Sequence, residues 1–417
     1  MRGRDPREKH RVSTPLELLF DLTFVLAFGA ASSELAHALA EGHIWAGIGA
    51  FAFAIFSVSW AWIHFAWFAS AYDTDDWVYR LTTMLQMVGV LILALGLPAM
   101  FESFGGPRID NRVMVLGYVV MRIPMCLQWW RASHQDPRHR LIARYYIGSI
   151  VISQILWCLL LLVADHPGLM FALATVPLAI ELAGPVVAQR KQGGPPWHAH
   201  HIAERYSLVI IIALGEGLVG TLATLSAIVG PEGPGWSLEV AVLGLAGTAL
   251  TFGMWWIYFV IPSGPLLEKF RGRSFGWGYG HIALFGATVA VGAGLHVAAY
   301  SIEHHCALSL PETVLCTVVP VALFIATIYA LYSALTHSFD PHHVWMIAGS
   351  GIVIVATVVC ACAGIGLVWC IALLAVTPWV SVVGYEWIGH RHNAAVLHGL
   401  ESSSASIDSP TRSLDAS

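Results

Sequence analysis

The sequence predicts an all-α polytopic membrane protein with about twelve transmembrane helices. Of its 417 residues, 57% are hydrophobic and 11% are charged, whereas a soluble globular domain is usually about 25% charged. The apolar residues gather in windows of about 20, the length that a helix needs to cross the hydrocarbon core of a bilayer. Breakers such as Gly105-Gly106-Pro107 and Gly193-Gly194-Pro195-Pro196 separate most of these windows. We therefore expect the lipid bilayer, and no nucleic acid, as the main partner of the chain.

Twelve candidate spans follow one another along the chain. The first begins at the helix-start signal Thr14-Pro15, and the turn residues Asp165-His166-Pro167-Gly168 separate the fifth from the sixth. The least certain boundary lies near Gly364–Gly366, between the last two spans. The predicted spans are roughly residues 15–38, 44–70, 78–101, 112–131, 141–164, 168–188, 203–229, 237–261, 277–300, 314–335, 344–365 and 367–386.

The distribution of Lys and Arg predicts the orientation. With a cytoplasmic N-terminus, the outer side receives only Arg108 and Arg112, whereas the inner side receives most of the other cations. An even number of spans places the C-terminus inside as well, so we expect a protein of the bacterial inner membrane. The segments are then a basic cytoplasmic N-terminus (1–14), a first half (15–188), a cytoplasmic linker (189–202), a second half (203–386) and a largely disordered cytoplasmic tail (387–417), which is Ser-rich from about Glu401.

The two halves share features that predict two parallel six-helix repeats. Each second span carries a Trp-rich stretch near its inner end, SWAWIHFAWF at 59–68 and MWWIYFV at 254–260, and each sixth span contains a proline, Pro177 or Pro378. An even number of helices per repeat relates the halves by an axis along the membrane normal. The alternative is that these similarities are common to all twelve-span proteins.

Two carboxylates, Glu17 and Asp21, open the first span and lie on one face of a helix. Thr14-Pro15-Leu16-Glu17 has the form of a capping box, which gives Glu17 a structural explanation. Asp21 lies one turn deeper and needs a cation, water or a proton. The second half also begins with an acid at its cytoplasmic end, Glu204, followed by Arg205.

A second group of ionisable residues follows the second span, in AYDTDDWVYR. Its acids either cap the third span or face Arg80 and the basic loop 131–144, as a gate network at the inner side. His64 lies about two turns in from the same end of the second span. The members are Asp73, Asp75, Asp76 and Arg80.

Three ionisable residues lie near the middle of the predicted membrane, and such residues usually face the interior of a bundle and pair with one another. Arg122 in the fourth span could pair with Glu181 in the sixth or with Glu216 in the seventh. Gly215 and Gly217 flank Glu216 and allow close helix approach or local unwinding, so Glu216 is the preferred site residue of the interior. Pairs that only lock the helices together are the structural alternative.

Neither a metal nor a cofactor is predicted. Two histidine groups, His198, His200 and His201 in the central loop and His304 with His305 in an outer loop, lack a recognised ligand spacing. The chain also contains no catalytic motif in a credible context, so we favour a non-enzymatic function.

Three stretches resemble the bacterial low temperature requirement A (LtrA) family: TPLELLFDLTFV, FASAYDTDDWVYRL and HHIAERYSLVIIIALGE. The resemblance covers about residues 11 to 390 and implies a polytopic cytoplasmic-membrane protein linked to growth at low temperature. Gly217 stands where the family often has Ser after LGE. Phe20-Asp21 also matches part of a first-helix signature of the endolysosomal potassium channels, whose Arg and Ser positions are absent here.

The leading hypothesis is a secondary transporter for a small solute or ion, with Glu216 and Glu181 as coupling carboxylates and the cytoplasmic acids as a gate. The alternatives are an ion channel, a membrane-embedded enzyme, and a scaffold or stress-response protein without transport. The sequence indicates neither the solute nor the oligomeric state.

Overall fold

The computed structural model describes residues 1–6, 8, 11–229, 235–337 and 341–389. In this part of the chain every long regular element is a helix, and twelve helices, single or in two pieces, are long and apolar enough to cross a membrane. The predicted tail from 390 onward lies outside the described residues. The first half contains α1 (Pro15–Ala40), α2 (Ile44–Tyr72), α3 (Trp77–Leu95), α4 (Leu97–Ser103), α5 (Arg112–Gln135), α6 (Arg140–Leu160) and α7 (Pro167–Gln192).

The second half contains α8 (Ala199–Val229), α9 (Leu238–Phe259), α10 (Ser263–Lys269), α11 (Ser274–Ile302), α12 (Leu310–Thr336), α13 (Pro341–Cys362), α14 (Leu367–Leu374) and α15 (Val376–Gly384). Short 3₁₀ turns lie at Pro137–His139, Leu161–Val163 and Arg271–Arg273, and a π-helical turn at Tyr385–Gly389 follows α15. Helices α7 and α8 extend into the predicted linker 189–202. The connection between the halves is therefore shorter than the sequence suggested, and it begins at Gly193, whose positive φ of 80° ends α7.

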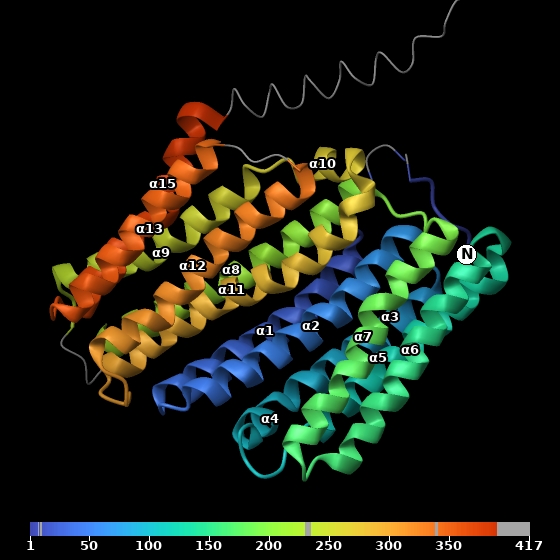
Figure 1. The fold of residues 1–417 in the computed structure, drawn as a ribbon, viewed down its shortest axis with the longest axis horizontal. Coiled ribbons are helices and arrows are strands. Elements are labelled where there is room, and N and C mark those ends of the chain that lie inside the picture. Colours follow the sequence, from blue (N-terminus) through green and yellow to red (C-terminus); the bar gives the residue numbers. More distant parts are fainter. Residues whose placement is uncertain (7, 9–10, 230–234, 338–340, 390–417) are drawn as a thin grey trace, which may run out of the picture.

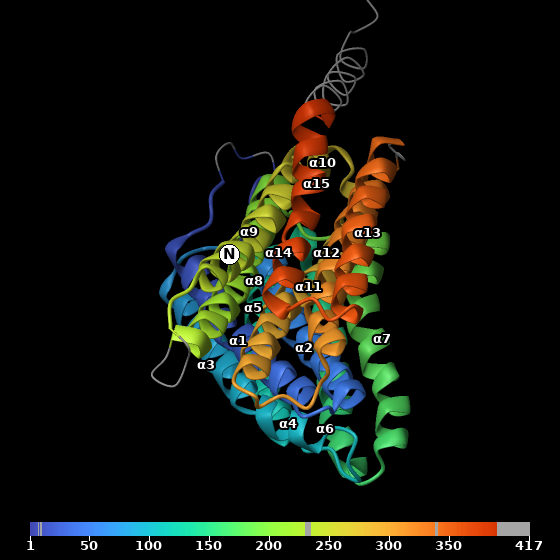
Figure 2. The same ribbon diagram turned by 90° about the vertical axis from the view of Figure 1, so that its left-hand side faces the viewer.

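Helices α1 and α2 lie between the remaining helices of the first half and those of the second (Figures 1 and 2). Helix α1 packs on α2 and α3 of its own half and on α8 and α11 of the other. Helix α11 is the most buried span, because α1, α8 and α12 surround it. The sequence did not single out α11 as the central helix, since hydropathy measures the apolar length of a helix and not its neighbours.

Glycines bring the central helices close together. A Cβ added at Gly292 of α11 would lie 2.5 Å from the carbonyl oxygen of Glu216 in α8, which no real side chain tolerates. Gly117 of α5 faces the backbone of α3 at Leu93 in the same way. Small residues permit such close backbone approach between membrane helices, where dispersion replaces the hydrophobic effect as the driving force for packing.

Each half repeats the same order of helix packing. Its first span packs on the second and third, the third on the fourth, the fourth on the fifth and the fifth on the sixth. A matching hydrogen bond joins the fifth and sixth spans: Ser153 donates to the Pro177 carbonyl (3.3 Å), and Ser350 donates to the Thr377 carbonyl (3.2 Å). These common features agree with two parallel repeats, and the duplication itself stays a prediction.

Candidate functional site

The first turn of α1 contains the capping box that the sequence predicts. The Thr14 hydroxyl accepts a hydrogen bond from the Glu17 N–H, and Oε2 of Glu17 accepts one from the Thr14 N–H at 2.8 Å. This cap accounts for one oxygen of Glu17. The other oxygen, Oε1, faces the neighbouring helix α8, so capping is only part of the role of Glu17.

Arg205 of α8 binds both carboxylates of α1. Its Nη1 lies 3.0 Å from Oε1 of Glu17, and its Nε donates to Oδ2 of Asp21 at 3.1 Å. All three side chains are buried. The four-residue spacing places Glu17 and Asp21 on one face of α1, and the packing of α1 against α8 supplies the cation. This arrangement explains how a carboxylate one turn inside the first span is tolerated.

Arg11 precedes α1 and inserts into the same group. Its Nη2 lies 3.6 Å from Glu17 and 3.7 Å from Asp73, and it donates to the carbonyl of Ala69 at 3.2 Å. The side chain is 3% exposed, although the sequence presented it only as one of several inner-side cations. Its role could not be read from spacing, because it depends on how the N-terminal segment crosses the end of α2.

Two further side chains complete this group. The indole of Trp62 donates to Oδ1 of Asp21 at 2.7 Å, and Nε2 of His201 lies 3.2 Å from Glu17. We call the six ionisable members the inner charge cluster: Arg11, Glu17, Asp21, Asp73, His201 and Arg205. With every Asp, Glu and Arg ionised and His201 neutral, the cluster carries one more negative than positive charge. Asp73 lies at its edge, where burial raises the pKa of its carboxyl although Arg11 opposes the shift.

The remaining acids after α2 pair at the surface. Asp76 caps α3 by accepting from the Tyr79 N–H, and Arg131 of α5 donates two hydrogen bonds to it, at 2.7 and 2.8 Å. Hydrogen bonding from Arg131 lowers the pKa of Asp76. Asp75 binds Arg80 in an exposed pair. The two readings of the sequence, a helix cap and pairing with Arg80 or the basic loop, therefore both describe this segment.

Glu204 and His64 lie apart from these pairs. Oε1 of Glu204 accepts a hydrogen bond from the Ser13 N–H at 3.2 Å and so helps to hold the N-terminal segment. His64 is buried between the rings of Trp60 and Tyr146, and neither of its ring nitrogens has a hydrogen-bond partner among the described residues. It is not part of the inner charge cluster.

A second buried polar group lies deeper in the first half. The Tyr118 hydroxyl of α5 donates to Oε2 of Glu181 in α7 at 3.0 Å and accepts from Nη2 of Arg122. Arg122 and Glu181 themselves are 3.9 Å apart, so Tyr118 bridges them. The structure thus places Arg122 with Glu181, one of the two partners that the sequence left open. Tyr118 was missed, although its spacing of four residues from Arg122 indicates a shared helix face.

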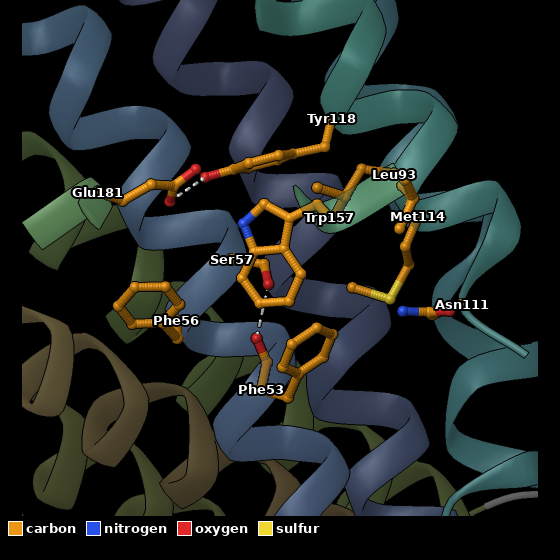
Figure 3. Close-up of a pocket in the computed structure, with 10 residues that line it drawn as sticks. Phe53, Phe56, Ser57, Leu93, Asn111, Met114, Tyr118, Trp157 and Glu181 are labelled. Carbon is orange, nitrogen blue, oxygen red and sulfur yellow. Dashed lines mark hydrogen bonds between the residues drawn. The ribbon is translucent and has the colours of Figure 1, made fainter. Parts of the chain in front are cut away.

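Tyr118 and Glu181 of this group line a small cavity (Figure 3). The cavity measures about 30 Å³ and is lined by residues of α2, α3, α5, α6 and α7, among them Ser57, Trp157 and Glu181. A space of that size holds about one water molecule. Glu181, which is buried, therefore faces a pocket between helices and not the acyl chains of the bilayer.

Glu216 lies elsewhere and does not pair with Arg122. Its carboxylate lies against α1, where a Cβ on Gly29 would come within 3.2 Å of Oε1, and its backbone packs on Gly292 of α11. Asp21, Glu181 and Glu216 consequently contact three different sets of residues. The sequence could not reveal this separation, because an apolar helix shows equal hydropathy on the faces that meet different neighbours.

The structure gives the histidines of the central loop separate partners. No group of three or more His, Cys, Asp or Glu side chains that could hold a metal ion occurs in the described part of the chain. His200 pairs with Glu268 at 3.0 Å, and Nε2 of His198 contacts the carbonyl of Glu8. His201, read from the sequence as a loop residue, lies in the first turns of α8 and belongs to the inner charge cluster.

In the residues that the structure describes, twelve apolar helices with two buried groups of ionisable residues define a multi-pass membrane protein of the α-helical class. The family model described as bacterial low temperature requirement A protein (LtrA) matches residues 12–378. The chain therefore belongs to the LtrA family. It is also similar to an uncharacterized protein of Rhizobium meliloti (strain 1021), with 28% identity over 306 residues, which cover 70% of each chain.

Proposed function

We propose that this LtrA-family protein is a secondary transporter of the bacterial inner membrane and that the Arg122–Tyr118–Glu181 group is its central binding site. One observation carries the proposal: the group is buried mid-way along its helices, and its members Tyr118 and Glu181 line a small cavity. Ionisable residues at such depth cost several kcal/mol. An ion pair that only holds helices together needs no cavity beside it. A site that binds and releases a proton or a solute needs such a cavity.

The packing of the first and seventh spans argues against an ion channel along them. Phe20, Phe24 and Phe28 of α1 are all buried, and Phe28 meets Phe285 of α11 at a ring distance of 6.3 Å. A pore along α1 and α8 requires a continuous polar lining, and these aromatic contacts fill that position. The aromatic contacts therefore favour a transporter whose closed bundle opens to one side of the membrane at a time over a channel with a continuous pore.

The membrane orientation belongs to the same proposal. Arg11, Arg131 and Arg271 lie at one end of the bundle, and Arg108 and Arg112 lie at the other, next to Asp165 and Asp110. The positive-inside rule assigns the first end to the cytoplasm. The inner charge cluster then closes the cytoplasmic end of the transporter.

Thiol accessibility tests the proposal without knowledge of the solute. Ser57 lines the cavity, so we replace it with Cys in a chain whose seven native cysteines are changed to Ser or Ala. A small membrane-impermeant thiol reagent is applied to right-side-out and to inverted vesicles. Alternating access predicts labelling of S57C from both sides, whereas T221C, at a buried position of α8, stays unlabelled. Protection of S57C from both sides excludes a transport site in this cavity.

Charge movement tests the coupling role of Glu181. The purified protein in liposomes on a solid-supported membrane is exposed to pH jumps and to a panel of solutes. We expect Glu181→Gln to lower the transported charge by at least about tenfold, whereas Glu239→Gln, in the exposed first turn of α9, leaves it unchanged. The scaffold alternative is supported if the wild-type protein in liposomes moves neither charge nor solute while growth of the bacterium in the cold still depends on the protein.

A further inference from the structure

A groove between α5 and α6 opens toward the lipid. It has a volume of about 530 Å³ and an almost wholly apolar lining. Its walls follow one face of α5 for about three turns and one face of α6 for about two. They include Ile123, Leu127 and Trp130 of α5, and Ile147, Val151 and Ile155 of α6.

Two polar side chains interrupt this apolar lining, and both lie at the same depth in the predicted membrane. Arg122 and Gln154 both border the groove and lie equally far along the chain from the turn that joins the antiparallel helices α5 and α6. Arg122 is 4% exposed, and its Nε has no hydrogen-bond partner among the described residues. Oε1 of Gln154 is likewise buried without a partner. Buried polar atoms usually have a partner in the protein, a water or an ion, so these two atoms can each form a hydrogen bond with a ligand.

Arg122 also connects the groove with the interior site. Its Nη2 binds the Tyr118 hydroxyl, but the 3.9 Å separation from Glu181 is too long for a direct hydrogen bond. The guanidinium therefore retains donors for an anion, and a carboxylate matches its planar fork. An anion bound here would lie beside Glu181 without entering the small cavity.

Size decides from which side a ligand reaches Arg122. The interior cavity of about 30 Å³ has room for about one water molecule. The groove of about 530 Å³ offers more than ten times that space. If a methylene group occupies roughly the volume of a water molecule, about 30 Å³, the groove accommodates on the order of one acyl chain.

We propose that the α5–α6 groove binds a single-chain amphiphile with a carboxylate head, placing the head at Arg122 and Gln154 and the chain along the apolar walls. This proposal rests on the proposed transport function and gives its substrate class. The head passes along the groove while the chain stays in the bilayer, so no large enclosed cavity is required.

The inner end of the groove supports this path. Arg144 lies one turn before Ile147 on the same face of α6, and His134 lies one turn after Trp130 on that of α5. Both are exposed at the predicted cytoplasmic surface. A carboxylate head thus meets a cation at the mouth of the groove and a second cation, Arg122, at its polar floor.

Binding is tested with spin-labelled stearic acid and its methyl ester, which differ only in the charge of the head. Purified protein in phosphatidylcholine vesicles is titrated with each probe, and the immobilised fraction is measured by electron paramagnetic resonance. We expect the acid to associate at least about threefold more strongly than the ester with wild-type protein. Arg122→Gln should abolish this preference, whereas Arg112→Gln, an exposed position at the start of the same helix, should preserve it.

A second variant guards against misfolding of Arg122→Gln. Val151→Trp fills the groove from its lipid side, where Val151 is 41% exposed, and leaves Arg122 unchanged. We expect weaker immobilisation of the acid. Equal association of acid and ester with wild-type protein, or a preference that survives both substitutions, shows ordinary boundary lipid only and overturns the proposal. Charge-selective binding without transport of charge or solute in the liposome assay leaves the groove valid and removes the transport function, so the two failures are distinguishable.

Discussion

At the scale of single residues, the inner charge cluster depends on one cation that serves two acids. Arg205 is fully buried and pairs with Glu17 and Asp21, while Arg11 approaches Glu17 and Asp73 from the N-terminal segment. Charges taken out of water are costly, and their mutual attraction repays that cost only while every partner is present. Removing one charged member should therefore destabilise the protein more than neutralising the two acids and the arginine together.

Replacing Arg205 by Met should destabilise the protein strongly. It leaves the buried Asp21 without a cation and Glu17 with Arg11 only, and removal of one partner of a buried ion pair costs about 3–5 kcal/mol. The thermal midpoint in detergent is the measurement, and the triple variant E17Q/D21N/R205M should recover most of the loss. Arg80→Met, which breaks an exposed pair with Asp75, should change the midpoint little. An Arg205→Met protein as stable as wild type would contradict the ion-pair geometry.

The Asp76–Arg131 pair makes stability depend on pH. Hydrogen bonding from Arg131 lowers the pKa of Asp76 below its ordinary value of 3.8. A carboxyl with a depressed folded-state pKa contributes stability above its unfolded pKa, and this contribution is lost as the pH falls. Asp76→Asn should therefore lower the thermal midpoint at pH 7, with a difference that shrinks below pH 3.8. An equal difference at both pH values would show that the charge of Asp76 contributes nothing.

At the scale of elements, Gly292 of α11 fixes how closely α11 approaches α8. Gly292 and Glu216 bring the backbones of α11 and α8 into contact, and α1 covers the same region. This packing explains why Glu216, with glycines on both sides in the sequence, lies at a helix contact and not at the Arg122 site. A Cβ on Gly217 would meet Thr251 of α9, whereas a Cβ on Gly215 would meet nothing within 4 Å, so the contact with α11 depends on Gly292 and not on the flanking glycines.

Gly292→Ala should therefore destabilise this contact. Its Cβ would lie 2.5 Å from a backbone oxygen that cannot move independently, and overpacking of this kind costs about 1–3 kcal/mol. Gly276→Ala on the same helix is the matched control, because a Cβ there meets nothing within 4 Å. The control should be neutral or stabilising. Equal thermal midpoints for the two variants would show that α8 and α11 are not in close contact.

At the scale of the whole molecule, twelve spans place the loop after α11 and the turn before it on opposite sides of the membrane. Cysteine at Glu303 should react with an impermeant thiol reagent from outside intact cells, and cysteine at Gly272 only in inverted vesicles. Both substitutions use a chain without native cysteines. Reaction of both positions from the same side would remove a span or reverse the predicted orientation.

The sequence by itself determined the helical class, the number of spans, the capping box at Thr14 and the shared face of Glu17 and Asp21. Hydropathy, capping signals and helical periodicity are local properties, so a single chain displays them directly. Only the tertiary structure decided that Arg205 and Arg11 match these acids, that Tyr118 joins Arg122 to Glu181, and that α11 lies at the centre. These choices depend on which faces of long apolar helices meet, and in a membrane every such face has nearly the same hydropathy.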